Sequence, residues 1–175
     1  SSMTKKPGTI VKEAVKMEKM LISGVAKDND VARISIIGVP DRPGLAFKVF
    51  SKLAAKDINV DIILQSIGRK DTKDISFTVT KGKLKDALSV LNDYCKILNA
   101  ANIVYDENVA KVSIVGAGME SHAGIAAEMF EALYEAQINI QMIATSEIKI
   151  SVLINAGDAD KAVTAIHNKF FPVDQ

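Results

Sequence analysis

The sequence predicts an α+β fold of two βαββαβ units in tandem, with the first unit inserted into the second. The first observation behind this is a repeat: the same order of strand and helix patterns occurs twice along the 175 residues. The second is a mismatch in the strand count. The second copy lacks its sixth strand, while a strand at 19–27 belongs to neither copy. The N-terminal strand is therefore expected to complete the second unit.

The first copy starts with an apolar strand at 32–38. From Gly44 onward, apolar side chains recur at the spacing of a helix with one buried face, and Asp57 ends that helix. Next comes a strand at 60–65 that alternates with a period of two residues. The later elements are a hairpin turn at 68–71, a return strand at 75–79, a helix from 84 to 95 and a strand at 102–105.

The second copy repeats this order with a turn that is two residues longer. Its elements are a strand around 112–115, a helix at 126–133, a strand at 140–144, a reversal at 146–147, a strand at 148–154 and a helix at 159–166. Identities at two fixed offsets carry the repeat. Ala32, Ser35, Ile36 and Gly38 recur 78 positions later, and Gly44, Phe50, Leu53, Ile58, Asn59 and Ser66 recur 80 positions later.

The composition narrows the class of protein. Apolar residues make up 48% of the chain, which is enough for a substantial core, and the net charge of +1 argues against nucleic-acid or membrane binding through bulk charge. Cys95 is the one cysteine, so no internal disulfide forms, and its place on an apolar helix face predicts a buried small hydrophobe. The sequence shows neither a signal peptide nor an apolar run that could span a membrane, so we expect a cytoplasmic protein.

The turn after the first strand is the main candidate for a binding site. Asp41 lies on this turn, and Pro43 and Gly44 are expected to open the following helix. One interpretation is structural: a carboxylate beside a helix N-terminus stabilises the helix dipole by roughly 0.3–1 kcal/mol. The other is functional, because the helix N–H groups suit the carboxylate of a free amino acid and Asp41 suits its ammonium.

The sequence predicts no catalytic apparatus, metal site or cofactor. It contains no nucleophile elbow and no phosphate-binding glycine-rich loop with its lysine. The two histidines, His122 and His167, have no neighbours at metal-ligand spacing.

Four segments together closely resemble the tandem ACT-domain regulatory part, or beta subunit, of aspartate kinase (aspartokinase). They are Val39–Gly44, Ile58–Gln65, Val115–Met119 and Ala144–Ile154. The resemblance covers about residues 19–170 and implies two ferredoxin-like ACT domains, the first (31–107) inserted into the second (19–30 with 108–171). Residues 1–18 would be a tail or linker from the kinase domain, and the likeness of 6–11 to the segment that closes that domain favours an excised regulatory domain over a natural subunit.

The resemblance also implies a function. The parent enzyme phosphorylates the β-carboxylate of L-aspartate with MgATP in the synthesis of lysine, threonine and methionine, but its catalytic domain is absent from this chain. The regulatory part would bind L-threonine, L-lysine or both and confer allosteric feedback inhibition. The implied partners are a second copy, bound as a homodimer through the ACT domains, and the kinase catalytic domain or subunit.

The resemblance assigns site residues by position. At a threonine-like site between two regulatory chains, Asp41 would hold the effector's ammonium and Gly44, Leu45 and Ala46 its carboxylate. The wall around the effector's side chain would be Gln65, Asn139 and Ile140. A possible second effector site would comprise Met119, Ser121, His122, Ala123, Gly124, Ser146 and Glu147, where no carboxylate takes the place of Asp41.

Two other functions fit the predicted topology. One is a free-standing ACT-type amino-acid sensor that regulates another enzyme or a transcription factor. The other is a pair of RNA-recognition-motif-like units, which share the βαββαβ order. Such units need exposed stacking aromatics on their central strands, where this sequence has Ile, Val and Ser.

Overall fold

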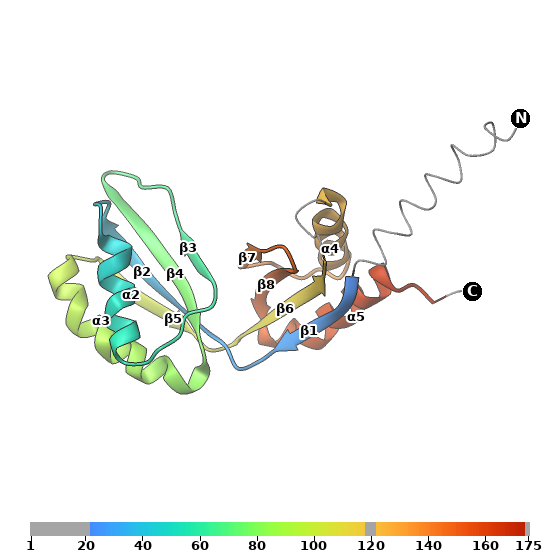
Figure 1. Ribbon diagram of the computed structural model, residues 1–175, viewed down its shortest axis with the longest axis horizontal. Coiled ribbons are helices and arrows are strands. Elements are labelled where there is room, and N and C mark those ends of the chain that lie inside the picture. Colours follow the sequence, from blue (N-terminus) through green and yellow to red (C-terminus); the bar gives the residue numbers. More distant parts are fainter. Residues whose placement is uncertain (1–21, 118–121, 174–175) are drawn as a thin grey trace, which may run out of the picture. The chain divides into compact units, whose positions relative to one another are not determined.

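The chain folds into two compact units, each with its own four-stranded sheet (Figure 1). The structure is a computed structural model that describes residues 22–117 and 122–173. The inserted unit comprises residues 29–109, and the split unit combines residues 22–28 with 110–117 and 122–173.

The inserted unit has the βαββαβ order that the sequence predicts. Its strand order is β3-β4-β2-β5, and all neighbouring strands are antiparallel. Helices α2 and α3 pack their buried faces on the same core as this sheet. The elements are β2 (Ala32–Pro40), α2 (Leu45–Ala55), β3 (Ile63–Gln65), β4 (Thr72–Val79), a 3₁₀ turn (Lys81–Lys83), α3 (Leu84–Leu98) and β5 (Asn102–Asp106).

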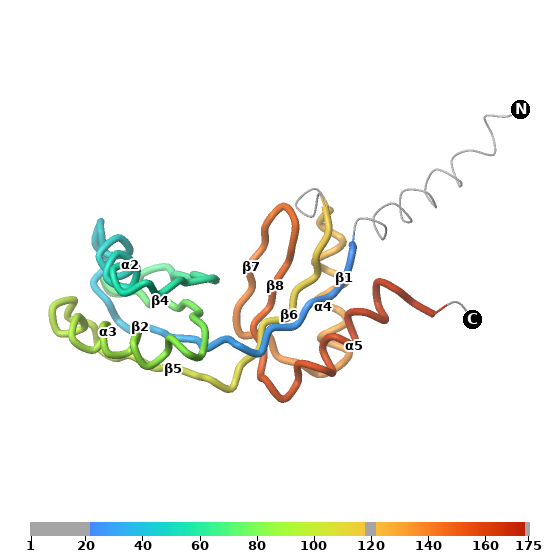
Figure 2. Tube along the Cα trace, turned by 60° about the horizontal axis from the view of Figure 1, so that its bottom comes forward, coloured from blue at the N-terminus to red at the C-terminus, as the bar shows by residue number. Residues whose placement is uncertain are grey.

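The split unit has the same topology, completed by the N-terminal strand. Its strand order is β1-β6-β8-β7, which can be followed in Figure 2. β1 (Ile22–Asp28) pairs antiparallel with β6 (Val109–Gly116), as β5 pairs with β2 in the inserted unit. This pairing confirms the insertion predicted from the strand count. The other elements are α4 (Ala123–Glu135), β7 (Met142–Thr145), β8 (Lys149–Asn155), a 3₁₀ turn (Ala156–Asp158) and α5 (Ala159–Phe170).

Each unit buries a core of its own, formed by the alternating strand positions and the helix stripes seen in the sequence. In the inserted unit, Ile34 and Ile36 of β2 and Phe77 of β4 are fully buried against both helices. In the split unit, Ile114 and Val152 occupy the corresponding places against α4 and α5. Cys95 is half-buried at the edge of the first of these cores, and this burial raises the pKa of its thiol.

The predicted strand at 60–65 is wrong in its first half. Only Ile63–Gln65 form the ladder with β4. The preceding backbone bonds to Thr78 instead, because the Thr78 hydroxyl accepts a hydrogen bond from the Ile62 N–H at 3.0 Å and its carbonyl accepts one from the Asp61 N–H. Leu64 is 47% exposed; it lies opposite Ser76, on the sheet face away from the buried Ile75 and Phe77.

Helices α2 and α4 end in the same way, 80 positions apart. Asp57 and Gln137 both adopt left-handed backbone conformations, with φ of 57° and 60°. The N–H groups of Ile58 and Ile138 then donate to carbonyls five residues earlier, on Leu53 and Leu133. This is the Schellman pattern of helix termination, and it explains why the first helix ends at Asp57 as predicted.

The repeat extends to a pair of hydrogen-bonded serine hydroxyls in each sheet, buried in the split unit and partly buried in the inserted unit. The Ser35 and Ser76 hydroxyls lie 2.7 Å apart on β2 and β4, and those of Ser113 and Ser151 lie 2.7 Å apart in the split unit. Ser35 and Ser76 are directly opposite each other in the ladder, beside the buried row of Ile34 and Phe77. The two central strands of the inserted unit thus carry small hydroxyls here instead of stacking aromatics.

Candidate functional site

The β2–α2 turn departs from the sequence prediction in where the strand ends and the helix begins. β2 does not stop at Gly38 but continues to Pro40 through a bulge at which Gly38 has a φ of 66°. Helix α2 begins at Leu45, so Pro43 is not a helical residue. Gly44 has φ 86° and ψ −4°, the conformation of the third residue of a type II turn, where proline favours the second position.

The N-terminus of α2 presents backbone N–H groups beside this turn. The first helical bond runs from the Lys48 N–H to the Gly44 carbonyl at 3.0 Å, so Leu45 and Ala46 precede the first donor that the helix itself satisfies. Gly44 is the N-cap residue and supplies no side-chain hydrogen bond. Asp41 lies four residues before the first residue of α2, whose free N–H groups favour an anion.

The β3–β4 hairpin folds back onto the turn that carries Asp41. The Asp41 N–H donates to the Asp71 carbonyl at 2.8 Å, and the Gly38 N–H donates to Oδ1 of Asp74 at 2.9 Å. Lys70 and Asp71, at the hairpin tip, both have positive φ, as a type I′ turn requires. These bonds join two segments about 30 residues apart into one site at the end of the sheet.

Two residues that the sequence analysis did not single out contact the Asp41 carboxylate. Nζ of Lys73 lies 3.1 Å from Oδ1 of Asp41. On the other side, a Cβ added to Gly68 would lie 2.5 Å from Oδ2, so only glycine leaves room for the carboxylate at that position. The hairpin thus both neutralises and positions the carboxylate.

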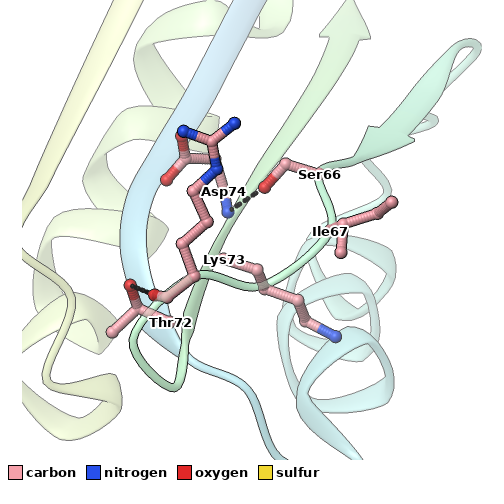
Figure 3. A pocket seen from close by; sticks show the side chains of 6 residues that line it. Ser66, Ile67, Thr72, Lys73 and Asp74 are labelled. Carbon is pink, nitrogen blue, oxygen red and sulfur yellow. Dashed lines mark hydrogen bonds between the residues drawn. The ribbon is translucent and has the colours of Figure 1, made fainter.

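An open cleft of about 670 Å³ lies along this hairpin (Figure 3). Its lining consists of Ser66, Ile67, Arg69, Thr72, Lys73 and Asp74. The Asp74 N–H donates to the Ser66 hydroxyl at 2.9 Å, which closes the hairpin at its base. In Figure 3 Thr72 and Lys73 extend to opposite sides of the strand, as neighbours on a strand do. The residues that line the cleft carry both hydroxyl and charged groups, which suit a small polar ligand.

Gln65 shares a sheet face with Lys73. It lies opposite Ile75 in the β3–β4 ladder, and Ile75 is two residues from Lys73, so the three side chains point to the same side. Gln65 is exposed. Asn139 and Ile140 belong to the split unit, on the segment between α4 and β7, where Asn139 is exposed and Ile140 packs against that unit's core.

The predicted second effector site falls partly outside the described residues, because Met119 and Ser121 are not among them. His122 is the N-cap residue of α4, and Ala123 and Gly124 are its first helical residues. Ser146 and Glu147 form the reversal between β7 and β8. The Gly116 N–H donates to the Ile148 carbonyl at 2.8 Å, so this reversal meets the end of β6 much as the β3–β4 hairpin meets the end of β2.

Within residues 22–117 and 122–173, no group of three or more His, Cys, Asp or Glu side chains is arranged to hold a metal ion. None of the helices in those ranges is long and apolar enough to span a membrane.

Comparison with known proteins matches both units to the ACT-domain family, over residues 34–94 and 112–170. The aspartate kinase of Stutzerimonas stutzeri is 46% identical over 166 residues; the match covers 94% of this chain but 40% of that protein. The chain thus spans about two fifths of the length of the curated relatives it matches.

Two solved structures match over nearly their whole length. The ligand-free regulatory subunit of aspartate kinase from Thermus thermophilus is 41% identical with a TM-score of 0.83, and the match covers 86% of this chain and 99% of that one. A chain in the structure of aspartokinase alpha and beta subunits is 45% identical with a TM-score of 0.80, over 85% of this chain and 98% of the other.

Proposed function

Because this chain belongs to the ACT-domain family and is a regulatory part of aspartate kinase, we propose that it binds an end-product amino acid and transmits that binding to the kinase as feedback inhibition. The observation that carries the proposal is the Asp41 carboxylate at the turn that leads into the N-terminus of α2. A free amino acid has an ammonium and a carboxylate a few ångströms apart, and these are the two groups that such a turn attracts.

The proposed effectors are L-threonine, L-lysine or both. Asp41 would pair with the effector's ammonium, and the backbone at Gly44, Leu45 and Ala46 would hold its carboxylate. Gln65 is exposed on the helix-bearing side of the sheet, where a polar group can reach an effector's side chain. The family resemblance adds Asn139 and Ile140 to the wall of the site, contributed across the interface between regulatory chains.

A second site would lie at the N-terminus of α4, with the reversal at Ser146 and Glu147 beside it. The Gly116–Ile148 hydrogen bond supports this, because it brings the reversal to the strand end from which the β6–α4 turn starts. This turn has no carboxylate in the register of Asp41. Its ligand would therefore have to be held by different contacts, with the neighbouring Glu147 as a candidate for the ammonium.

Inhibition would be a coupling free energy between effector binding and kinase activity. The effector can favour one arrangement of the regulatory chains only by binding that arrangement more tightly than the other. The proposed partners are a second copy of this chain and the catalytic domain or subunit that phosphorylates L-aspartate with MgATP. The existence of an aspartokinase with separate alpha and beta subunits, one chain of which is 45% identical to this protein, supports the second partner.

Titration calorimetry with L-threonine, L-lysine and both together tests the proposal. Asp41→Ala should weaken binding of the effector at least tenfold, because removing one partner of a charge pair at an interface costs on the order of 2–5 kcal/mol. The fold should survive, since the Asp41 side chain is 45% exposed and lies outside the core.

Asp93→Ala is the matched control, because it removes an exposed carboxylate from α3 of the same unit. It should bind the effector as the wild type does. Equal affinity in Asp41→Ala and wild type, with circular dichroism unchanged, would mean that another carboxylate or another turn holds the ammonium.

A further inference from the structure

The Lys73 ammonium contacts the Asp41 carboxylate, the group that the proposed function pairs with the ammonium of the effector. Its Nζ lies 3.1 Å from Oδ1 of Asp41. The Lys73 side chain is only 17% exposed, whereas Asp41 is 45% exposed. The lysine therefore reaches the carboxylate from the protein side, while the carboxylate remains open to solvent.

The position of Lys73 follows from the strand register. The bulge at Gly38 shifts the pairing of β2 with β4, so that Lys73 lies opposite Val39, two residues before Asp41. Lys73 also shares its sheet face with Ile75, which is buried beneath the helices. The alkyl part of the Lys73 side chain is thus largely covered. Its ammonium lies beside Asp41, just after the end of β2.

We propose that Lys73 acts as a built-in competitor of the effector. Its ammonium occupies Asp41 when no amino acid is bound, and it is displaced when the α-ammonium of the effector takes its place. The two groups have the same chemistry, each an –NH₃⁺ with three donors. This inference rests on the proposed function, and it assigns to Lys73 the role of setting effector affinity.

Competition by Lys73 would lower the affinity for the effector. A ligand that must displace an internal partner binds more weakly than it would to an unoccupied carboxylate, because the lost Lys73–Asp41 contact is subtracted from the new one. A lysine that instead helped to hold the effector's carboxylate would have the opposite effect. The direction of the change in affinity on removing the ammonium therefore distinguishes the two roles.

The test is effector affinity in Lys73→Met, which keeps the length and apolar stem of the side chain but removes the charge. It should bind the effector about two- to fivefold more tightly than the wild type, which is the scale expected for a partly exposed ion pair. Lys70→Met is the matched control, because it removes an exposed lysine from the same hairpin. Its affinity should change less than twofold.

Nuclear magnetic resonance of the lysine side chains gives a second readout that does not depend on a substitution. Addition of the effector to the wild type should shift the Lys73 Cε and Nζ resonances and leave those of Lys70 in place. Unchanged or weaker binding by Lys73→Met, or an unmoved Lys73 signal at saturation, would overturn the competitor role while leaving the proposed function intact. If neither wild type nor Lys73→Met binds L-threonine or L-lysine, the proposed function itself fails and this inference fails with it.

Discussion

The Asp41 carboxylate is held from both sides by the β3–β4 hairpin. Lys73 contacts one oxygen, and the bare backbone of Gly68 leaves space for the other. Asp41 and Gly44 could be singled out from the sequence because they are neighbours on one strand–turn–helix segment. Gly68 and Lys73 could not be singled out in this way, because they lie 27 and 32 residues further along the chain. Their contact with Asp41 depends on a bulge at Gly38, which no local sequence pattern predicts.

Gly68→Ala should therefore weaken effector binding without disturbing the fold of the unit. Its Cβ would lie 2.5 Å from Oδ2 of Asp41 and 3.1 Å from the Thr72 carbonyl oxygen, so the carboxylate must rotate away. We expect at least a fivefold loss of affinity, or about 1 kcal/mol, by calorimetry.

Gly82→Ala provides the comparison for Gly68→Ala. It lies in the same unit, and an added Cβ there meets no atom within 4 Å. Its affinity should match that of the wild type. Equal affinities for all three proteins would mean that the carboxylate has another rotamer that serves the effector as well.

At the scale of elements, the strand end and the hairpin form one assembly in each unit. In the inserted unit it is joined by the bonds from Asp41 to Asp71 and from Gly38 to Asp74, and in the split unit by that from Gly116 to Ile148. The types and order of these elements were predictable from hydrophobic period and turn residues. The shortened β3 was not, because it depends on the Thr78 hydroxyl, which competes with the ladder for the backbone at 61–62.

The paired serines predict a measurable coupling between strands. Ser113 and Ser151 are 5% and 2% exposed, and their hydroxyls lie 2.7 Å apart. Ser113→Ala would leave the buried Ser151 hydroxyl without this partner, which should lower the free energy of unfolding by about 1–3 kcal/mol in urea denaturation.

The double variant Ser113→Ala/Ser151→Ala removes both hydroxyls and should cost less than the sum of the two single changes. Ser23→Ala, which removes an exposed hydroxyl bonded to the Val115 carbonyl, should cost under about 1 kcal/mol. Strict additivity of the two buried changes would show that the hydroxyls do not stabilise each other.

At the scale of the whole molecule, two units of one topology each have a core and a sheet of their own. This could be predicted from the sequence because the repeat recurs at fixed offsets and the strand count left one place for the strand at the N-terminus. The oligomeric state could not be predicted from the repeat in the same way, because an interface between chains depends on exposed side chains that no repeat or strand count identifies. The edge strand β3 offers one such surface, with Ile63 and Leu64 46% and 47% exposed.

We therefore expect a homodimer in which inserted units associate. Sedimentation at tens of micromolar should give twice the mass of the 18.8 kDa chain, with and without L-threonine. Leu64→Lys, which adds a charge to the exposed edge, should raise the dimer dissociation constant at least tenfold, whereas Tyr134→Lys on the exposed face of α4 should not. A wild type that sediments as a monomer in both conditions would contradict the dimer.

The proposed effector site holds one amino acid, with its ammonium on Asp41 and its carboxylate at the start of α2. A crystal structure of the chain grown with saturating L-threonine tests it most directly. We expect the threonine ammonium about 3 Å from the Asp41 carboxylate, the threonine carboxylate on the N–H groups of Leu45 and Ala46, and Nζ of Lys73 moved off Oδ1 of Asp41. Threonine bound elsewhere, with the Lys73–Asp41 contact still at 3.1 Å, would contradict it.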